Sequence, residues 1–429
     1  MSQELRAEEV AIRAQDIVAC MERTRSTEFD TLSSLGLAVR LAVHLRGAPP
    51  VEYELLRKVA VHVLNFQTAE VKPVLQLLAA GAFVDLVTEG TSIKTVIPNI
   101  PFFDNLYESI GQVGLANPLT ETEQLTIEIT QRLSESPIAK DSLSLLGAET
   151  KLTNGVLEIG TQGGFILSRR ARGREILISP TYFGENEAAY ADLVAAQGAG
   201  RVKKVLGALR GMQGWPLALI ERGTLPNGVT LDAEDVAVLR ALAGDGFIRP
   251  PAIQTSHHGT NYFLFGPRPG AARLPLNKKA IFEAAMALVA AVRQGQLLPA
   301  AYAIKWPAAI LRGLRDNGFI GANSEALEQY RQVALLKVGR LEHCHGTKYR
   351  FVLNNDRPEN LEAIELALTL LRGDEVQAQP EQEVVLALRQ GESYVEALIG
   401  RKQLVAEKPV RLNEDDRAEL ETLLYGGRT

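Results

Sequence analysis

One arrangement of residues recurs along this chain of 429 residues and limits how it can fold. A short polar residue and a glutamate begin a leucine-rich helical stretch, and two short β-prone runs around a glycine-containing turn follow it. The two most similar copies share a His-Gly-Thr-x-Tyr turn, at 258–262 and at 345–349. A repeated pattern of this kind predicts several copies of one small domain rather than a single large core.

Three anchors in the last two copies indicate a repeat of about 90 residues. Their offsets are 91, 90 and 87 residues for Trp215-Pro216 with Trp306-Pro307, Asn227-Gly228 with Asn317-Gly318, and the two His-Gly-Thr-x-Tyr turns. Each Trp-Pro pair is expected to begin a helix, with proline in the first turn and tryptophan anchored in the core.

The earlier copies are less regular. In the first, a helix at Tyr53–Leu64 precedes a second helix capped by Thr68, and a hairpin follows with strands at Val84–Val87 and Ile93–Ile97. In the next, a short helix at Ser142–Leu146 precedes strands at Phe165–Arg169 and Glu175–Ile178, without the leucine-rich helix of the other copies.

A cluster of helices closed by a two-stranded hairpin resembles the winged-helix superfamily, a branch of the helix-turn-helix proteins. The resemblance covers about 51–355, and its most specific elements are Val238–Phe247 and Gly259-Thr260-Asn261-Tyr262. It implies a mainly α fold with small β-hairpins (α+β), arranged as a tandem array of about four winged-helix domains flanked by helical segments. The expected parts are helical segment 1–50, winged-helix units 51–118, 119–185, 186–270 and 271–356, and helical segment 357–429.

Composition limits the classes of function. The formal net charge is -5, so binding to nucleic acid would have to come from local basic patches. The two cysteines, Cys20 and Cys344, lie far apart, which predicts no disulfide framework and agrees with a reducing cytoplasm. The N-terminus lacks a signal-peptide core, and no apolar run approaches the roughly 18 residues of a membrane span. We therefore expect a cytoplasmic protein without a membrane partner.

The most basic predicted turn lies in the second unit. Its arginines would gain from meeting phosphates, although charged residues at a sheet edge also serve simply to prevent aggregation. Three basic residues farther along the chain are expected to extend the same face at helical spacing. The candidate phosphate contacts are Arg169, Arg170, Arg172, Arg174, Arg201, Lys203 and Lys204.

The two His-Gly-Thr turns supply further candidates for contact with nucleic acid, namely His258, Thr260, His345, Thr347 and Lys348. Tyr262 and Tyr349 are expected to pack under their hairpins. The acidic helix starts at Asp232–Asp235 and at Glu325 suit the helix dipole, but they are poorly suited to a DNA backbone and favour protein partners for these two units.

No pattern of catalytic or cofactor-binding residues is found. The histidines beside Cys344 lack the spacing of a zinc site, and the glycine-rich segment 160–164 lacks the lysine and serine of a phosphate-binding loop. The sequence thus predicts a non-enzymatic protein without metal or cofactor. Duplex DNA is the first expected partner, in the manner of a transcriptional regulator; structured RNA and protein–protein interaction within a larger assembly are the alternatives. The sequence predicts no oligomeric state.

Overall fold

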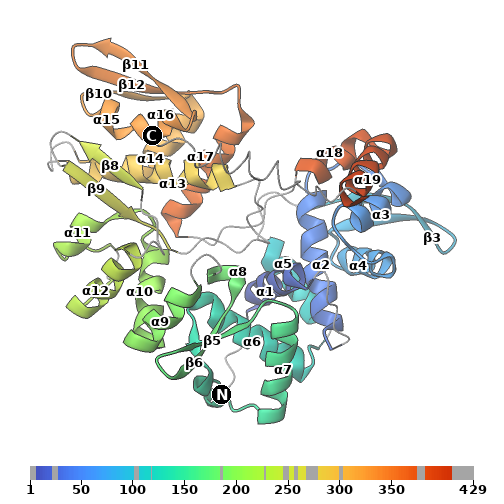
Figure 1. Cartoon of the computed structure of the whole chain (residues 1–429). Helices are drawn as coiled ribbons and strands as arrows, with labels where there is room; N and C mark the ends of the chain where they lie inside the picture. The colour runs from blue at the N-terminus through green and yellow to red at the C-terminus, as the bar shows by residue number, and fades with distance from the viewer. Residues whose placement is uncertain are drawn as a thin grey trace, which may run out of the picture. The chain divides into compact units, whose positions relative to one another are not determined.

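The computed structural model separates the chain into two compact units. It describes residues 6–21, 28–100, 106–116, 118–183, 187–226, 229–244, 251–255, 259–266, 279–298, 303–373 and 382–407. One compact unit combines residues 1–43 with 103–379, and the other combines 44–102 with 380–429. The described part is mainly helical, and its strands form small antiparallel sheets (Figure 1), which confirms the expected α+β class.

Four three-stranded sheets are described, and all four are built in the same chain order. A short strand comes first, helices follow, and a two-stranded hairpin comes last. The short strand pairs with the last strand of the hairpin, so the spatial order is first, third, second. We number these parts modules 1 to 4 along the chain.

The elements of each module follow one another closely. Module 1 consists of β1 (Val51–Glu52), α3 (Tyr53–His62), α4 (Thr68–Ala80), β2 (Val84–Glu89) and β3 (Ser92–Pro98). Module 2 consists of β4 (Ile138–Ala139), the 3₁₀ helix η1 (Lys140–Leu146), α7 (Thr150–Gln162), β5 (Leu167–Ala171) and β6 (Arg174–Ile178). Module 3 consists of β7 (Trp215–Pro216), α11 (Leu217–Glu221), α12 (Ala233–Gly244), β8 (Ala252–Thr255) and β9 (Gly259–Leu264). Module 4 consists of β10 (Phe319–Asn323), α15 (Ala326–Gln329), α16 (Arg331–Leu335), β11 (Gly339–His345) and β12 (Lys348–Leu353).

Module 2 is more regular than its sequence indicates. The sequence predicts no leucine-rich helix in this module, but the structure contains one, α7, in which Leu152, Val156 and Ile159 recur at helical spacing. Gly155 and Gly160 interrupt that pattern, because glycine lowers helix propensity. At Gly160 the missing side chain matters for packing, since a Cβ atom there would lie 2.6 Å from Ile166 Cδ1.

Two details of the expected repeat are wrong. Trp215 is buried in β7, opposite Leu264, whereas Trp306 lies at the start of α14 (Pro307–Asn317) and is 77% exposed. The strand of module 4 that corresponds to β7 is therefore β10, and the tryptophans do not match in space. Tyr262 is also 46% exposed rather than packed under its hairpin. Asn227-Gly228 and Gly246-Phe247 lie outside the described residues.

One buried helix helps to form the core between modules 3 and 4. Helix α13 (Lys279–Gln294), continued by the 3₁₀ turn η3 (Gly295–Leu297), is buried almost all round and contacts α17 (Pro358–Arg372) and α14. It contains Ala284–Val292, the longest apolar run of the sequence, so the run serves a protein core. Among the helices that the structure describes, none has the length and apolar character needed to cross a bilayer.

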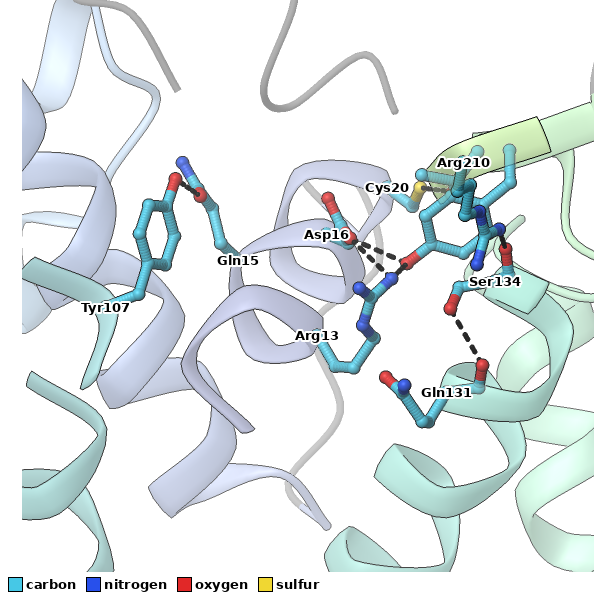
Figure 2. Close-up of polar contacts among 10 residues, drawn as sticks. Arg13, Gln15, Asp16, Cys20, Tyr107, Gln131, Ser134 and Arg210 are labelled. Carbon is cyan, nitrogen blue, oxygen red and sulfur yellow. Dashed lines mark hydrogen bonds and ion pairs between the residues drawn. The ribbon is translucent and has the colours of Figure 1, made fainter. Parts of the chain in front are cut away.

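The N-terminal helices pack beside module 2. They are α1 (Ala7–Cys20), α2 (Asp30–Leu45), α5 (Leu106–Leu115) and α6 (Glu121–Glu135), and a turn, α8 (Pro180–Phe183), follows the module 2 hairpin. Figure 2 shows how polar side chains fix α1: Arg13 and Asp16, both 1% exposed, form an ion pair at 3.2 Å. Tyr182 of α8 donates a hydrogen bond to Asp16 at 2.6 Å and accepts one from Arg13. Hydrogen bonds of this kind offset part of the cost of burying a pair of charges.

Helices near the C-terminal end of the described chain pack on module 1. Both α18 (Gln382–Gln390) and α19 (Glu392–Glu407) contact α3 in the second compact unit. Val384, Ala387 and Val395 are fully buried there, and Lys58 of α3 forms an ion pair with Glu392. The expected helical segment 357–429 is thus divided, because α17 belongs to the first compact unit.

Candidate interaction surfaces

The arginine-rich turn predicted in module 2 is the tip of the β5–β6 hairpin. Arg172, with φ of 50°, and Gly173, with φ of 78°, form the turn between the strands. The guanidinium of Arg172 makes two hydrogen bonds to the carboxylate of Asp192, at 2.8 and 3.0 Å. Arg169 forms an ion pair with Glu187, and both acids belong to α9 (Glu187–Gln197). Two of the four arginines at this hairpin tip therefore already have carboxylate partners.

The other two arginines of this tip keep their charge open to solvent. Arg170 and Arg174 are exposed, and neither forms an ion pair within the described ranges of the chain. Glu175, opposite Arg170 in the ladder, accepts hydrogen bonds from Ser168 at 2.7 Å and from Lys140 at 3.1 Å. These two bonds lower the pKa of Glu175, with a smaller contribution from the charge of Arg170.

The three basic residues expected to extend this face lie on α10 (Ala199–Gly211) and are all ion-paired. Arg201 pairs with Glu234 and lies 3.7 Å from Asp232, Lys204 pairs with Asp235, and Lys203 pairs with Glu135. The acidic first turn of α12 and the basic face of α10 thus neutralise each other.

Asp235 is the most buried member of these pairs, at 1% exposure. Its burial alone would raise the pKa of its carboxyl group. The hydrogen bonds from Lys204 and from the backbone N–H of Asp232 outweigh this effect, so the pKa is lowered. The charged form of Asp235 therefore stabilises the folded chain.

The β11–β12 hairpin of module 4 exposes the predicted residues His345, Thr347 and Lys348 at its tip. The neighbouring His343 ring makes a hydrogen bond to the carbonyl of Gly346 at 2.8 Å and packs edge-on against Tyr349. In module 3, Thr260 is exposed at the start of β9, whereas His258 lies outside the described residues. Among the described side chains, no group of three or more metal-ligating residues is close enough to hold an ion.

The helix immediately before each hairpin, here called the pre-hairpin helix, has no excess of positive charge in any module. These helices are α4, α7, α12 and the pair α15–α16, and each contains one basic residue. The basic residues are Lys72, Lys151, Arg240 and Arg331; the acids on the same helices are Glu70, Glu158, Glu234, Asp235 and Glu328. The net charge of each helix is therefore zero or negative.

In module 4 the pre-hairpin helices also expose leucine. Leu335, at the end of α16, is 75% exposed, Leu327 on α15 is 44% exposed, and Leu336 is 39% exposed. Trp306 and Phe319 of the same part of the chain are exposed as well, and Arg350 lies over the Phe319 ring at 5.8 Å. Exposed apolar patches are typical of surfaces that contact another protein, and module 4 contributes four of the large apolar side chains that are exposed in the described part of the chain, namely Phe319, Leu327, Leu335 and Leu336.

In module 2 the pre-hairpin helix lines an open groove of about 800 Å³, whose other wall is α6. Apolar side chains form its floor, and glutamates surround it. The apolar residues are Leu125, Leu146, Leu152, Val156 and Ile159; the acidic residues are Glu28, Glu121, Glu128, Glu149 and Glu158. Lys151 is the single basic residue of the lining within the part of the chain that the structure describes. The sequence does not predict this surface, because Gly155 and Gly160 obscure the helical period of α7.

Comparison with known proteins adds no further constraint on function. No protein-family model matches the chain, and no curated protein is significantly similar to it.

Proposed function

We propose that the four modules are winged-helix domains arranged in tandem. The support is the shared chain order, in which a short strand precedes the helices and pairs with the second strand of the hairpin. This is the strand order of a winged helix, in which the hairpin forms the wing. The fold alone does not decide the ligand, because winged helices serve both nucleic-acid and protein binding.

We further propose that the protein is a non-enzymatic docking subunit, which uses these domains to bind other proteins in an assembly. One observation carries this proposal: no pre-hairpin helix has a net positive charge, and those of module 4 expose leucines. In DNA-binding relatives of this fold the corresponding helix enters the major groove between two rows of phosphates. A neutral or acidic helix gains nothing from those phosphates, whereas exposed leucines gain from an apolar partner.

Isolation of the full-length tagged chain from its native host tests this proposal. We expect a stoichiometric protein partner that survives nuclease treatment and is lost from the double variant Leu327→Ser/Leu335→Ser. Both side chains are exposed, so the variant should keep the wild-type thermal stability. Val87→Ser, which removes a side chain that is 47% exposed in module 1, is the matched control and should retain the partner. A chain that is always isolated alone, or only with nucleic acid, would overturn the proposal.

Duplex binding through a wing is a second candidate function, favoured by Arg170 and Arg174, which have no carboxylate partner among the described residues. Its test is a titration of duplex DNA against salt, with hairpin RNA as competitor. If these arginines contact phosphates, Arg170→Ala/Arg174→Ala should reduce the salt slope by about 2, since each phosphate contact contributes roughly 0.9. Arg169→Ala/Arg172→Ala should have a smaller effect, because those arginines must first leave Glu187 and Asp192. Equal slopes for the wild type and both variants would exclude the wing from the contact.

A further inference from the structure

The groove between α6 and α7 combines two properties that single out one kind of ligand. The apolar surface of its floor comes from the partly exposed Leu146, Leu152 and Ile159, which lie beside the buried Leu125 and Val156 in the lining. A ligand that covers this floor must therefore present apolar side chains of its own.

The rim of the groove is negative along both walls. Glu121 and Glu128 line the α6 wall two turns apart, and Glu149 and Glu158 lie at the start and on the exposed face of α7. Among the described residues, only part of this charge is compensated: Glu128 pairs with Arg132 at 3.2 Å, whereas Glu158 accepts a neutral hydrogen bond from Gln162. A nucleic acid would meet like charge here, so the rim selects a cation.

We infer that this groove binds a basic amphipathic helix of a partner protein, with leucine-like side chains on the floor and lysine or arginine against the rim. The inference rests on the proposed docking function and names the chemistry of one partner. Helix-in-groove recognition uses anchors at positions i, i+3 or i+4, and i+7, which span about 10 Å of helix axis. Glu121 and Glu128, which are seven positions apart, are separated by about the same length along α6.

The chain itself offers a poor occupant in its C-terminal tail. Residues 408–429 include leucines at helical spacing, but Glu414, Asp415, Asp416, Glu419 and Glu421 lie among them. The segment also contains Lys408, Arg411, Arg417 and Arg428, so its net charge is -1 (four basic against five acidic residues) and it brings no excess of positive charge to the groove glutamates. The charge on the rim therefore points to another protein.

A designed peptide serves as the probe. It has 18 residues, leucine at the anchor positions and lysine elsewhere, capped ends and a fluorescent label, and its binding to the full-length chain is followed by anisotropy. We expect a Kd below about 100 µM at low salt, which rises with salt because the attraction is partly electrostatic. The same peptide with glutamate in place of lysine, or with serine in place of leucine, should not bind.

Gly155 makes it possible to block the groove without damaging the fold. It lies in the lining, and a Cβ atom built on it would have no neighbour within 4 Å. Gly155→Leu therefore fills the groove and should weaken peptide binding at least tenfold, while thermal unfolding occurs at the same or a higher temperature. Gly207→Leu is the matched control, because Gly207 is exposed on α10 outside the groove and also has free space at its Cβ position.

Charge reversal gives an independent test of the rim. Glu121→Lys/Glu158→Lys should weaken binding by about tenfold at low salt and less at high salt. Glu359→Lys/Glu383→Lys changes the net charge equally at exposed positions of α17 and α18 and should leave the affinity unchanged. Binding that is insensitive to both Gly155→Leu and the groove reversal would overturn the inference. If the native partner is still lost from the Leu327/Leu335 variant, the docking function stands and only the groove assignment is wrong.

Discussion

Two glycines of α7 occupy very different surroundings, although they lie five residues apart on one helix. The Cβ position of Gly155 faces open space in the groove, whereas that of Gly160 lies 2.6 and 2.8 Å from Ile166 Cδ1 and Cγ1. Glycine costs a helix about 0.5–1 kcal/mol relative to alanine, because it loses more backbone entropy on folding. At Gly155 nothing in the module offsets this cost, while at Gly160 close packing does.

Alanine at these two positions should therefore act in opposite directions. We expect Gly155→Ala to raise the free energy of unfolding by about 0.5–1 kcal/mol. Gly160→Ala should lower it by about 1–2 kcal/mol, because the added methyl group overpacks Ile166. Urea denaturation followed by circular dichroism measures both. A destabilised Gly155→Ala protein would mean that the groove is filled in the free chain.

The Lys204–Asp235 pair predicts a dependence of stability on pH. The pKa of Asp235 is lowered in the folded chain, so its contribution is complete above the ordinary aspartate pKa of about 4 and is lost as the pH falls through the lowered value. Lys204→Met removes the hydrogen bond and should cost about 1 kcal/mol at pH 7, a modest amount because the lysine is 48% exposed.

The difference in free energy of unfolding between this variant and the wild type should shrink as the pH falls below about 4 and through the lowered pKa of Asp235, because the carboxyl group is then protonated in both proteins. Chemical denaturation at pH 7 and at pH 3 measures the free energy of unfolding of both proteins. Lys203→Met is the control: its partner Glu135 is more exposed, so the loss should stay near zero at both pH values. An equal loss for Lys204→Met at pH 7 and pH 3 would show that packing, rather than charge, is responsible.

Ion pairs of this kind explain why the sequence shows where charged residues lie but does not show whether they are free to bind a ligand. Arg172 is 20 residues from Asp192, and Lys204 is 31 residues from Asp235, so a run of bases looks unpaired until the helices are placed. Surface charge was therefore overestimated at the module 2 tip and on α10. The exposure of His345 to Lys348 is easier to predict, because it depends only on the hairpin turn, and the local His-Gly-Thr pattern indicates that turn.

At the scale of elements, hairpins and leucine-rich helices were predicted well because both depend on local patterns. The expected hairpins of all four modules agree with β2–β3, β5–β6, β8–β9 and β11–β12. The helix α7 was missed because two glycines dilute its apolar period, and with it the acidic groove was missed. The short strands β1, β4 and β7 have two residues each, too few for any alternation of apolar and polar side chains.

The tryptophans show how a matched sequence pair can occupy different elements. Trp215 lies in β7, donates a hydrogen bond from its indole nitrogen to the carbonyl of Thr224 at 3.0 Å, and has Arg293 over its ring at 4.9 Å. Trp306 precedes α14 and is exposed. The duplication is therefore supported by the order of strands rather than by the Trp-Pro anchors.

This difference predicts unequal effects of removing the two rings. Trp215→Ala should lower the free energy of unfolding by about 3–5 kcal/mol, as expected for a buried aromatic residue. Trp306→Phe should change it by less than about 0.5 kcal/mol. Because the chain has only two tryptophans, each single-tryptophan protein also reports its own environment. Acrylamide should quench Trp306 strongly in a Trp215→Phe protein and Trp215 weakly in a Trp306→Phe protein; equal quenching would contradict the placement.

At the scale of the whole molecule, modules 2, 3 and 4 belong to one compact unit, whereas module 1 forms the other with the C-terminal helices. No local pattern reveals such a long-range association, since the sequence from Pro358 onward predicts only two or three helices. Module 1 depends on them because α3 packs against both. A small domain that borrows part of its core from a distant segment should lose stability when that segment is removed.

A chain that ends after Gly373 should therefore destabilise module 1 selectively. It lacks Val384, Ala387, Leu388 and Val395, which are buried in the full chain, so the face of α3 that they cover becomes exposed. We expect amide exchange of α3 to accelerate on the order of 100-fold, because exposing a few apolar side chains costs several kcal/mol of local stability. Exchange in α13 and α17 should stay unchanged, since both belong to the other compact unit. A chain that ends after Glu407 retains α18 and α19 and should exchange like the full chain. Protection of α3 that persists after removal of both helices would show that module 1 is stable without them.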